Sequence, residues 1–185
     1  MKERNRRDRP IYRSTDLPTG ELRGLFLLPE EVLARTREAL TSFALEGIDD
    51  GGHEGIVYWA GREMGDCTVF LQAVVPIADH SYGRVMVDRS EVGRMQRAAR
   101  SMKLGILCQF HSHPGSDGRH SDGDDSLILL PFEGMLSIVA PFFGTRFRSL
   151  SELCVHQYQE GRWVLCSLES VTRQVVVVAP CQDLR

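Results

Sequence analysis

The feature that most constrains this chain is a run of ligand-type polar residues that directly follows a short apolar segment. The apolar segment, residues 105–110, reads GILCQF, and the polar run, residues 111–124, reads HSHPGSDGRHSDGD. A short apolar run bounded by Gly predicts a buried strand. If the chain stays extended past this strand, His111 and His113 present both imidazoles to one side, because side chains two apart point the same way. The loop that follows is rich in Gly, Ser and Asp, so it can fold back and bring Asp124 to the same place.

Two histidines and one carboxylate at the end of a strand predict a three-ligand zinc site. Zinc in catalytic sites has three protein ligands and an open fourth position, whereas structural sites are usually closed by four. We therefore expect His111, His113 and Asp124 to bind Zn²⁺. On chemistry alone, the neighbouring Asp122 and Asp125 are alternatives for the carboxylate ligand.

The pattern His-x-His-Pro, followed by Ser and, three residues later, Asp, resembles the JAMM motif, also called MPN-plus, of a family of metalloproteases. By ordinary residue frequencies, these five letters occur by chance in roughly one such chain in tens of thousands. The motif also asks for a Glu at the start of a buried strand that ends in Gly, and residues 54–61 (EGIVYWAG) supply it. The resemblance covers about residues 22–179, is weak outside these two blocks, and selects Asp124 as the third ligand.

The resemblance implies a role for two further residues. Glu54 would be the general base, which takes a proton from the zinc-bound water and passes it to the leaving amine. Ser121 would donate a hydrogen bond to the tetrahedral intermediate. A nucleophilic serine is the competing interpretation, but the sequence places no separate base for it, and zinc-bound water is the better nucleophile at neutral pH.

Ser121 and Asp124 also have a structural interpretation. Ser-x-x-Asp is close to a capping box, here at the start of a short helix expected at residues 125–130. The two interpretations are compatible, because a cap would hold the Asp124 carboxylate rigid.

Four other histidines have no assigned role. His53 and His120 adjoin the candidate residues, and we expect both to face solvent because a site with three protein ligands is already full. His80 and His156 have no partner that the sequence reveals.

The rest of the chain predicts an α/β fold. Amphipathic spacing predicts helices at residues 29–45, with Pro29 in the first turn, and 87–102, and residues 77–86 and 141–150 read as irregular. Helices at the ends and between many strands favour an α/β sandwich with a mixed, curved sheet. The JAMM fold is similar: a curved sheet wrapped by helices in a sandwich like that of cytidine deaminases. The strands are expected at residues 22–28, 54–61, 67–76, 105–110, 135–140, 153–158 and 162–168, with a further segment at 171–178.

Length and composition limit the number of domains, the classes of partner and the compartment. The 185 residues predict one domain, residues 21–185, preceded by a basic tail, residues 1–20. A net charge of −3 gives no field that would attract nucleic acid or anionic lipid. No apolar run is long enough to span a membrane, and no secretory leader is seen, which predicts a cytoplasmic protein. Five scattered cysteines fit a reducing compartment, so we expect free thiols, including Cys154 and Cys166.

For function, the resemblance implies a zinc-dependent peptidase or isopeptidase that acts on the C-terminal tail of a ubiquitin-like protein. The setting would be a bacterial system that conjugates ubiquitin-like proteins, with activating-like and conjugating-like enzymes as further partners. One alternative is the processing of sulfur-carrier proteins or small amino-acid adducts. A second is a non-catalytic MPN scaffold, although such scaffolds characteristically lack the metal ligands that this chain has.

Overall fold

The computed structural model describes residues 16–127 and 131–179. Most of the expected basic tail lies outside these ranges, as do Cys181 and residues 128–130, so the proposed division into tail and domain stays a prediction. None of the described helices is long and apolar enough to cross a membrane. The helices are α1 (Glu30–Glu46), α2 (Arg89–Ser101), α3 (Asp122–Leu127) and α4 (Leu168–Gln174), with short 3₁₀ turns η2 (Ile48–Asp50), η3 (Phe142–Gly144) and η4 (Leu150–Glu152).

The strands form a mixed nine-stranded sheet and a separate hairpin. The nine-stranded sheet has the order β1-β10-β9-β8-β7-β3-β4-β2-β11, with β5 and β6 forming the hairpin. The strands are β1 (Thr19–Gly20), β2 (Leu25–Pro29), β3 (Ile56–Met64), β4 (Cys67–Val74), β5 (Asp79–Ser81), β6 (Arg84–Met86), β7 (Gly105–Ser112), β8 (Leu136–Ala140), β9 (Cys154–Gln159), β10 (Arg162–Cys166) and β11 (Val175–Val178).

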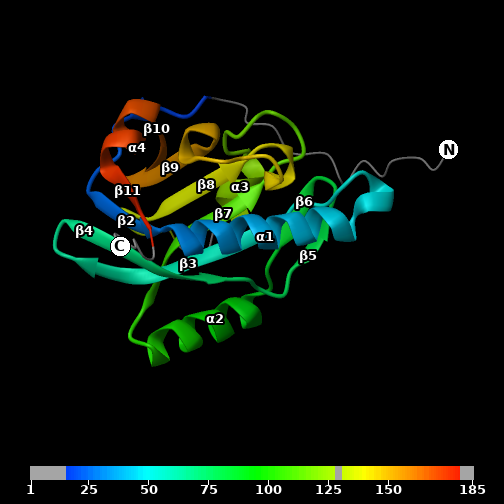
Figure 1. Ribbon diagram of the computed structural model, residues 1–185, viewed down its shortest axis with the longest axis horizontal. Helices are drawn as coiled ribbons and strands as arrows, with labels where there is room; N and C mark the ends of the chain where they lie inside the picture. The colour runs from blue at the N-terminus through cyan, green and yellow to red at the C-terminus, as the bar shows by residue number, and fades with distance from the viewer. Residues whose placement is uncertain (1–15, 128–130, 180–185) are drawn as a thin grey trace, which may run out of the picture.

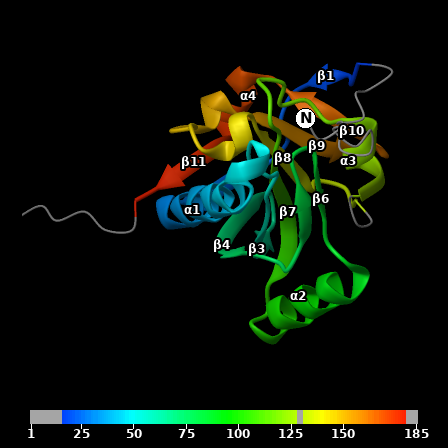
Figure 2. The ribbon, with the colours of Figure 1, turned by 90° about the vertical axis from the view of Figure 1, so that its right-hand side faces the viewer.

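Two helices cover opposite faces of the sheet, which curls around α1 (Figure 1). The larger core cluster packs α1 against side chains that include Trp59, Phe70 and Phe110. On the other face, Val92 and Met95 of α2 pack against Ile56 and Tyr58 of β3, and Figure 2 shows α2 well apart from α1. The predicted class, a mixed and curved sheet wrapped by helices, is confirmed.

Helix α1 has the stop and the buried face that its sequence predicts, and it starts one residue later than expected, at Glu30. Pro29 is its N-cap, and the first-turn acids Glu30 and Glu31 suit the positive end of the helix dipole. Gly47 is the C-cap, and its backbone N–H bonds to the carbonyl of Leu45. The buried side chains recur at helical spacing and are Val32, Leu33, Thr36, Leu40 and Phe43.

The pairing of the central strands brings the two motif blocks to one end of the sheet. Strand β3 runs antiparallel to β7, with Ile56 opposite His111, so the start of β3 meets the end of β7. Strand β8 runs parallel to β7, with Val139 opposite His111, so its carboxyl end lies there as well. The residues just before Ile56 and just after Ser112 therefore meet at this end.

Several predicted boundaries were wrong. Strand β7 continues to Ser112 because β8 pairs with it as far as Ser112 and β3 as far as His111. Strand β3 starts at Ile56, so Glu54 precedes it, and Gly61 is not its end. Instead, Gly61 lies at a break in the ladder, where an added Cβ would stand 2.1 Å from the Val69 carbonyl oxygen.

The chain ends and connections also differ in part from the prediction. Residues 77–86 include the β5–β6 hairpin, and residues 171–178 combine the end of α4 with β11. The short helix expected at residues 125–130 begins at Asp122.

The four described cysteines are free, as expected. Strands β9 and β10 pair with Leu165 opposite His156. Cys154 and Cys166 are therefore one residue out of register, and neighbouring positions in a strand point to opposite faces.

The hydroxyl of Thr36 predicts a stability effect in the core. Trp59 Nε1–H donates to Thr36 Oγ1 at 2.8 Å, and both residues are fully buried. Thr36→Val keeps the shape but leaves the indole N–H without an acceptor, so we expect unfolding to become easier by about 1–3 kcal/mol. Urea denaturation measures this loss. In the control Thr41→Val, the lost hydroxyl bonds only within α1, and the effect should be smaller.

Candidate metal centre

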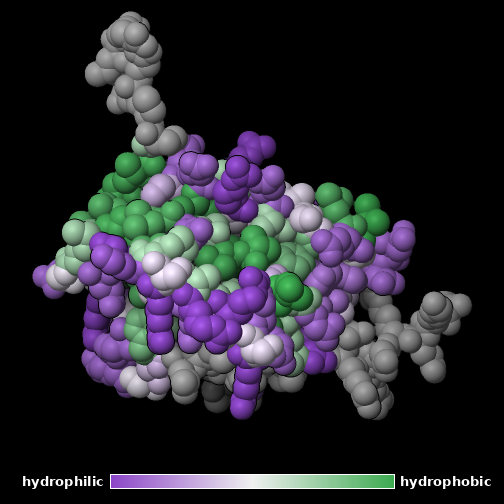
Figure 3. Space-filling model, turned by 90° about the horizontal axis from the view of Figure 1, so that it is seen from below, coloured by the Kyte–Doolittle hydropathy of each residue, from purple (hydrophilic) through white to green (hydrophobic). Residues whose placement is uncertain are grey.

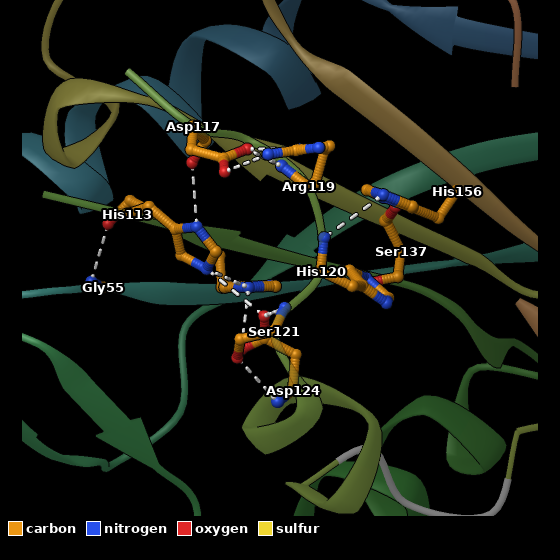
Figure 4. Close-up of polar contacts among 11 residues, drawn as sticks. Gly55, His113, Asp117, Arg119, His120, Ser121, Asp124, Ser137 and His156 are labelled. Carbon is orange, nitrogen blue, oxygen red and sulfur yellow. Dashed lines mark hydrogen bonds and ion pairs between the residues drawn. The ribbon is translucent and has the colours of Figure 1, made fainter. Parts of the chain in front are cut away.

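Three side chains converge at the end of β7. His111 Nε2 and His113 Nε2 are 3.3 Å apart. Each also lies 3.3 Å from a different carboxylate oxygen of Asp124, Oδ1 for His111 and Oδ2 for His113. Figure 4 shows the His113 ring directed at the segment that carries Ser121 and Asp124. These three are the one group of His, Cys, Asp or Glu side chains in the described residues with metal-site spacing.

This donor set fits a divalent metal ion. Zinc binds His nitrogen and carboxylate oxygen at about 2.0–2.2 Å, which places tetrahedral ligand atoms roughly 3.4 Å from one another. The two imidazole nitrogens lie 3.3 Å apart, and each lies 3.3 Å from one of the two Asp124 carboxylate oxygens, which is close to that spacing. All three side chains are at least largely buried, so a cation between them would offset the cost of burying the carboxylate.

The backbone holds His113 in the orientation that a ligand needs. Its N–H bonds to the Ala140 carbonyl at 2.9 Å, which keeps the chain extended beyond β7. Its Nδ1 lies 3.0 Å from the Asp117 carbonyl. A carbonyl oxygen only accepts, so the ring proton is on Nδ1 and the lone pair of Nε2 faces the site.

Asp124 is held by a reciprocal capping box at the start of α3. The Ser121 backbone N–H donates to Asp124 Oδ2 at 2.6 Å, and the Asp124 backbone N–H donates to Ser121 Oγ at 3.2 Å. The prediction of a capping box that fixes the carboxylate is therefore confirmed, with the helix starting three residues earlier than expected.

The electrostatics of the metal-free site follow from burial and from these contacts. Burial raises the pKa of Asp124, but the charges and hydrogen bonds of His111 and His113 outweigh it and hold that pKa well below its usual range. Burial lowers the pKa of His113, but the Asp124 carboxylate and the charge of Glu54 outweigh it, with a net rise to about 9. Without metal, the site therefore holds a proton close to where a cation would bind.

Glu54 is held beside these three residues but is not one of them. Its backbone N–H bonds to the Ser81 carbonyl at 2.9 Å, and the N–H of the next residue, Gly55, bonds to Ser112 Oγ at 2.9 Å. The side chain is 5% exposed. Burial raises its pKa to about 8; His113 lowers the pKa and Asp124 raises it further. A bound cation would lower this pKa. Glu54 is therefore a group whose protonation would respond to a metal ion at the expected ligands.

No family model matches the sequence. A curated protein from Sinorhizobium fredii, named probable metalloprotease y4jG, is 28% identical over 140 residues, which are 73% of this chain and 86% of that protein. The name of this relative agrees with the resemblance of the His111–Asp124 motif to the JAMM/MPN-plus metalloproteases.

A solved structure has a similar fold. Protein DSY2949 from Desulfitobacterium hafniense is 15% identical and superposes with a TM-score of 0.61 over 84% of this chain and 94% of that one. AF2198, a JAB1/MPN domain protein from Archaeoglobus fulgidus, is 15% identical with a TM-score of 0.43 over 82% and 96% of the two chains. The second score is too low to add to the argument.

Two histidines next to the candidate metal site are not where the sequence placed them. His120 was expected to face solvent, but it is 1% exposed and stacks on His156, with ring centroids 4.0 Å apart. His156, which showed no partner in sequence, is fully buried and contacts Ser137. Burial first, and then the charge of His120, hold the pKa of His156 well below its usual range. The only available signal was the position of His156 inside a predicted strand.

The other two histidines also pair, at the approach to Glu54. His53 Nδ1 and His80 Nδ1 lie 2.9 Å apart, and His80 Nε2 lies 3.2 Å from Glu46 Oε2. Both rings are largely buried, so the prediction that His53 faces solvent was wrong.

A surface groove lies elsewhere on the molecule. Its volume is about 680 Å³, and it runs between α1 and residues 73–80. Its lining includes Phe43, Val75 and Ile77 but none of the expected ligands. Figure 3 shows hydrophobic surface between groups of hydrophilic side chains on the face seen from below. The groove does not coincide with the candidate metal site, which lies at the strand ends.

The proton in the metal-free site predicts a linkage between metal binding and pH. A ligating imidazole must lose its proton, and the pKa of His113 is about 9, so Zn²⁺ binding at pH 7.5 should release at least about one proton. Because His113 is protonated below its raised pKa, the apparent affinity should fall by roughly tenfold per pH unit as the pH falls below 9.

Calorimetric titration of metal-free protein in two buffers with different ionisation enthalpies measures the released protons. His113→Ala should lose metal binding. Binding that is independent of pH between 6 and 9, or a variant that binds as tightly as the parent, would contradict the assignment.

Proposed function

We propose that this protein is a zinc-dependent peptidase or isopeptidase. The observation that carries the proposal is the convergence of His111, His113 and Asp124 at mutual distances of 3.3 Å, beside the buried Glu54. The relative named a probable metalloprotease supports a metal-dependent hydrolase. His₂Asp ligation suits zinc, which in such sites polarises a carbonyl and lowers the pKa of water.

Glu54 is the proposed general base. It takes a proton from the attacking water and delivers it to the leaving amine. Its burial keeps the carboxyl away from bulk water, and its pKa of about 8 in the metal-free site moves toward neutrality or below when a cation is present. A pKa near the working pH suits both halves of this proton transfer.

Ser121 is the proposed donor to the developing oxyanion. Its Oγ accepts the backbone N–H of Asp124, so the hydroxyl proton remains available to the substrate. The same hydroxyl caps the helix that carries Asp124, so its role in the cap and its role as oxyanion donor are coupled. With water as the nucleophile, a serine nucleophile is not needed.

The proposed substrate is a ubiquitin-like protein, cut at its extended C-terminal tail. The tail would enter between α2 and the chain after Asp124 and bind through backbone hydrogen bonds. The reacting centre lies at a strand end where His111 is 2% and His113 8% exposed. A bulky side chain next to the scissile bond would be blocked there, which favours Gly.

The proposed setting is a bacterial cytoplasm, with activating-like and conjugating-like enzymes as further partners. Processing of sulfur-carrier proteins or small amino-acid adducts remains the alternative for the same chemistry. The scaffold alternative has less support, because this chain retains the complete ligand set.

Replacing the proposed base tests the mechanism. Glu54→Gln should reduce turnover by at least about a hundredfold while zinc binding is retained, because the residue moves a proton and is not a ligand. Metal content and turnover are measured on the same preparation. Glu63→Gln, an exposed acid at the far end of β3, is the matched control and should leave both unchanged. Loss of zinc from the Glu54 variant would show that the assigned role is wrong.

A defined substrate tests the specificity. A folded ubiquitin-like protein whose tail ends in Gly, fused to a reporter, should be cut directly after that Gly, and Gly→Leu at this position should abolish cleavage. Mass spectrometry of the products locates the cut. Intact substrate with zinc-loaded enzyme, or cuts only in unfolded chains, would contradict this substrate class and favour the small-adduct alternative.

A further inference from the structure

His120 and His156 lie behind the metal centre and take no part in the chemistry proposed above. Both are almost fully buried, and Figure 4 shows them with Ser137 beside the segment that leads to Ser121. His120 also packs edge-on against Trp163, with ring centroids 5.1 Å apart. Burying polar rings is costly unless they are hydrogen-bonded, so the hydrogen bonds of these two rings indicate their structural role.

The contacts of His156 fix its tautomer. Its Nδ1 lies 3.3 Å from the Ser137 carbonyl oxygen, which only accepts, so Nδ1 carries the proton. Its Nε2 is then an acceptor, and the backbone N–H of His120 points at it with a nitrogen–nitrogen distance of 3.4 Å. The side chain of His156 on β9 therefore binds the backbone of the loop that carries the third ligand.

The ring of His120 adds a second attachment at the same point. His120 Nε2 lies 2.7 Å from Ser137 Oγ on β8, and the His120 ring stacks on that of His156. One residue of the loop is thus held by two neighbouring strands, through its backbone on one side and its ring on the other.

The attachment lies directly before the capping box. The first half of the loop is held where the Gly115 carbonyl accepts from Phe142 N–H and the Asp117 carbonyl faces His113. The next residue after His120 is Ser121, whose N–H bonds to the Asp124 carboxylate at 2.6 Å. A shift of His120 would therefore move the cap and, with it, the carboxylate oxygens.

We propose that His156 is a positioning residue for metal binding: by accepting the His120 N–H, it fixes the loop and so sets the place of the Asp124 carboxylate. The inference rests on the proposed metal site and adds a residue that lies outside the JAMM motif. Partners that bond directly to metal ligands change affinity by about ten- to a hundredfold when they are removed, and His156, which acts through the His120–Ser121 segment, should have an effect at the lower end of that range.

The test is the zinc affinity of His156→Leu, measured at pH 7.5 by competition with a chromophoric chelator. Leu retains an apolar side chain of similar size but leaves the His120 N–H without its acceptor, so we expect affinity to fall by about tenfold. His156→Gln can supply an acceptor oxygen and should recover most of the affinity. Titration with Co²⁺ adds a second readout, because its visible absorption reports ligand geometry; the Leu variant should change that spectrum and the Gln variant should not.

A matched control separates positioning from general stability. Gln159 is also buried on β9, and its amide bonds to the Glu21 carbonyl at 2.8 Å, away from the metal loop. Gln159→Leu should lower the urea midpoint without changing zinc affinity. If His156→Leu does not fold, Ser137→Ala removes only the hydroxyl that contacts His120 and should weaken zinc binding in the same direction.

Two outcomes have distinct meanings. Parent-like zinc affinity in a folded His156→Leu variant, or in Ser137→Ala where the Leu variant does not fold, would overturn the positioning role while leaving the metal site intact. A parent protein that binds no zinc would instead overturn the proposed function on which the inference rests.

Discussion

The burial of two imidazoles and a carboxylate at the end of β7 is the constraint on which the rest of the site depends. An unpaired carboxylate in such a place is expensive, and hydrogen bonds to one or two neutral groups offset only part of that cost. In the metal-free site, a proton on His113 supplies the missing positive charge, which is why burial and pairing shift the pKa values of His113 and Asp124 in opposite directions. A divalent cation can replace that proton, and the same contacts that raise the pKa of His113 then favour the metal.

The sheet makes this arrangement possible because it fixes which ends meet. Antiparallel pairing places the start of β3 against the end of β7, so Glu54 arrives beside His111 although 57 positions separate them along the chain. Parallel pairing with β8 brings in Ala140, whose carbonyl extends the ladder to His113. Glu54, His111 and His113 are thus placed by the backbone hydrogen bonds of the sheet and its extensions.

The sequence predicted those features whose cause is local. The apolar run before His111, the helical spacing of α1 and the Ser121–Asp124 cap each depend on residues within a few positions, and all three were confirmed. The hairpin β5–β6 was missed because it is short and polar, and its place depends on contacts such as the bond between Ser81 and Glu54. Residues 111–124 predicted the three-residue cluster for a similar reason: the motif is compact and its spacing is restrictive.

The buried histidines could not be predicted, because their burial is a property of the assembled sheet. His120 has polar neighbours in sequence, and its ring partners lie on strands distant in sequence, Ser137 on β8, His156 on β9 and Trp163 on β10.

The three expected ligands are held in place in two different ways. His111 and His113 belong to a strand and its direct extension and are fixed by the ladder. Asp124 belongs to a short helix that reaches them through a loop, so its position depends on the attachments of that loop. A change in the sheet core would therefore alter folding before it altered the histidines, whereas a change behind the loop would alter the carboxylate first. The proposed metal site therefore depends on two supports: the strand ladder, which fixes the histidines, and the attachments of the chain before α3, which fix the Asp124 carboxylate.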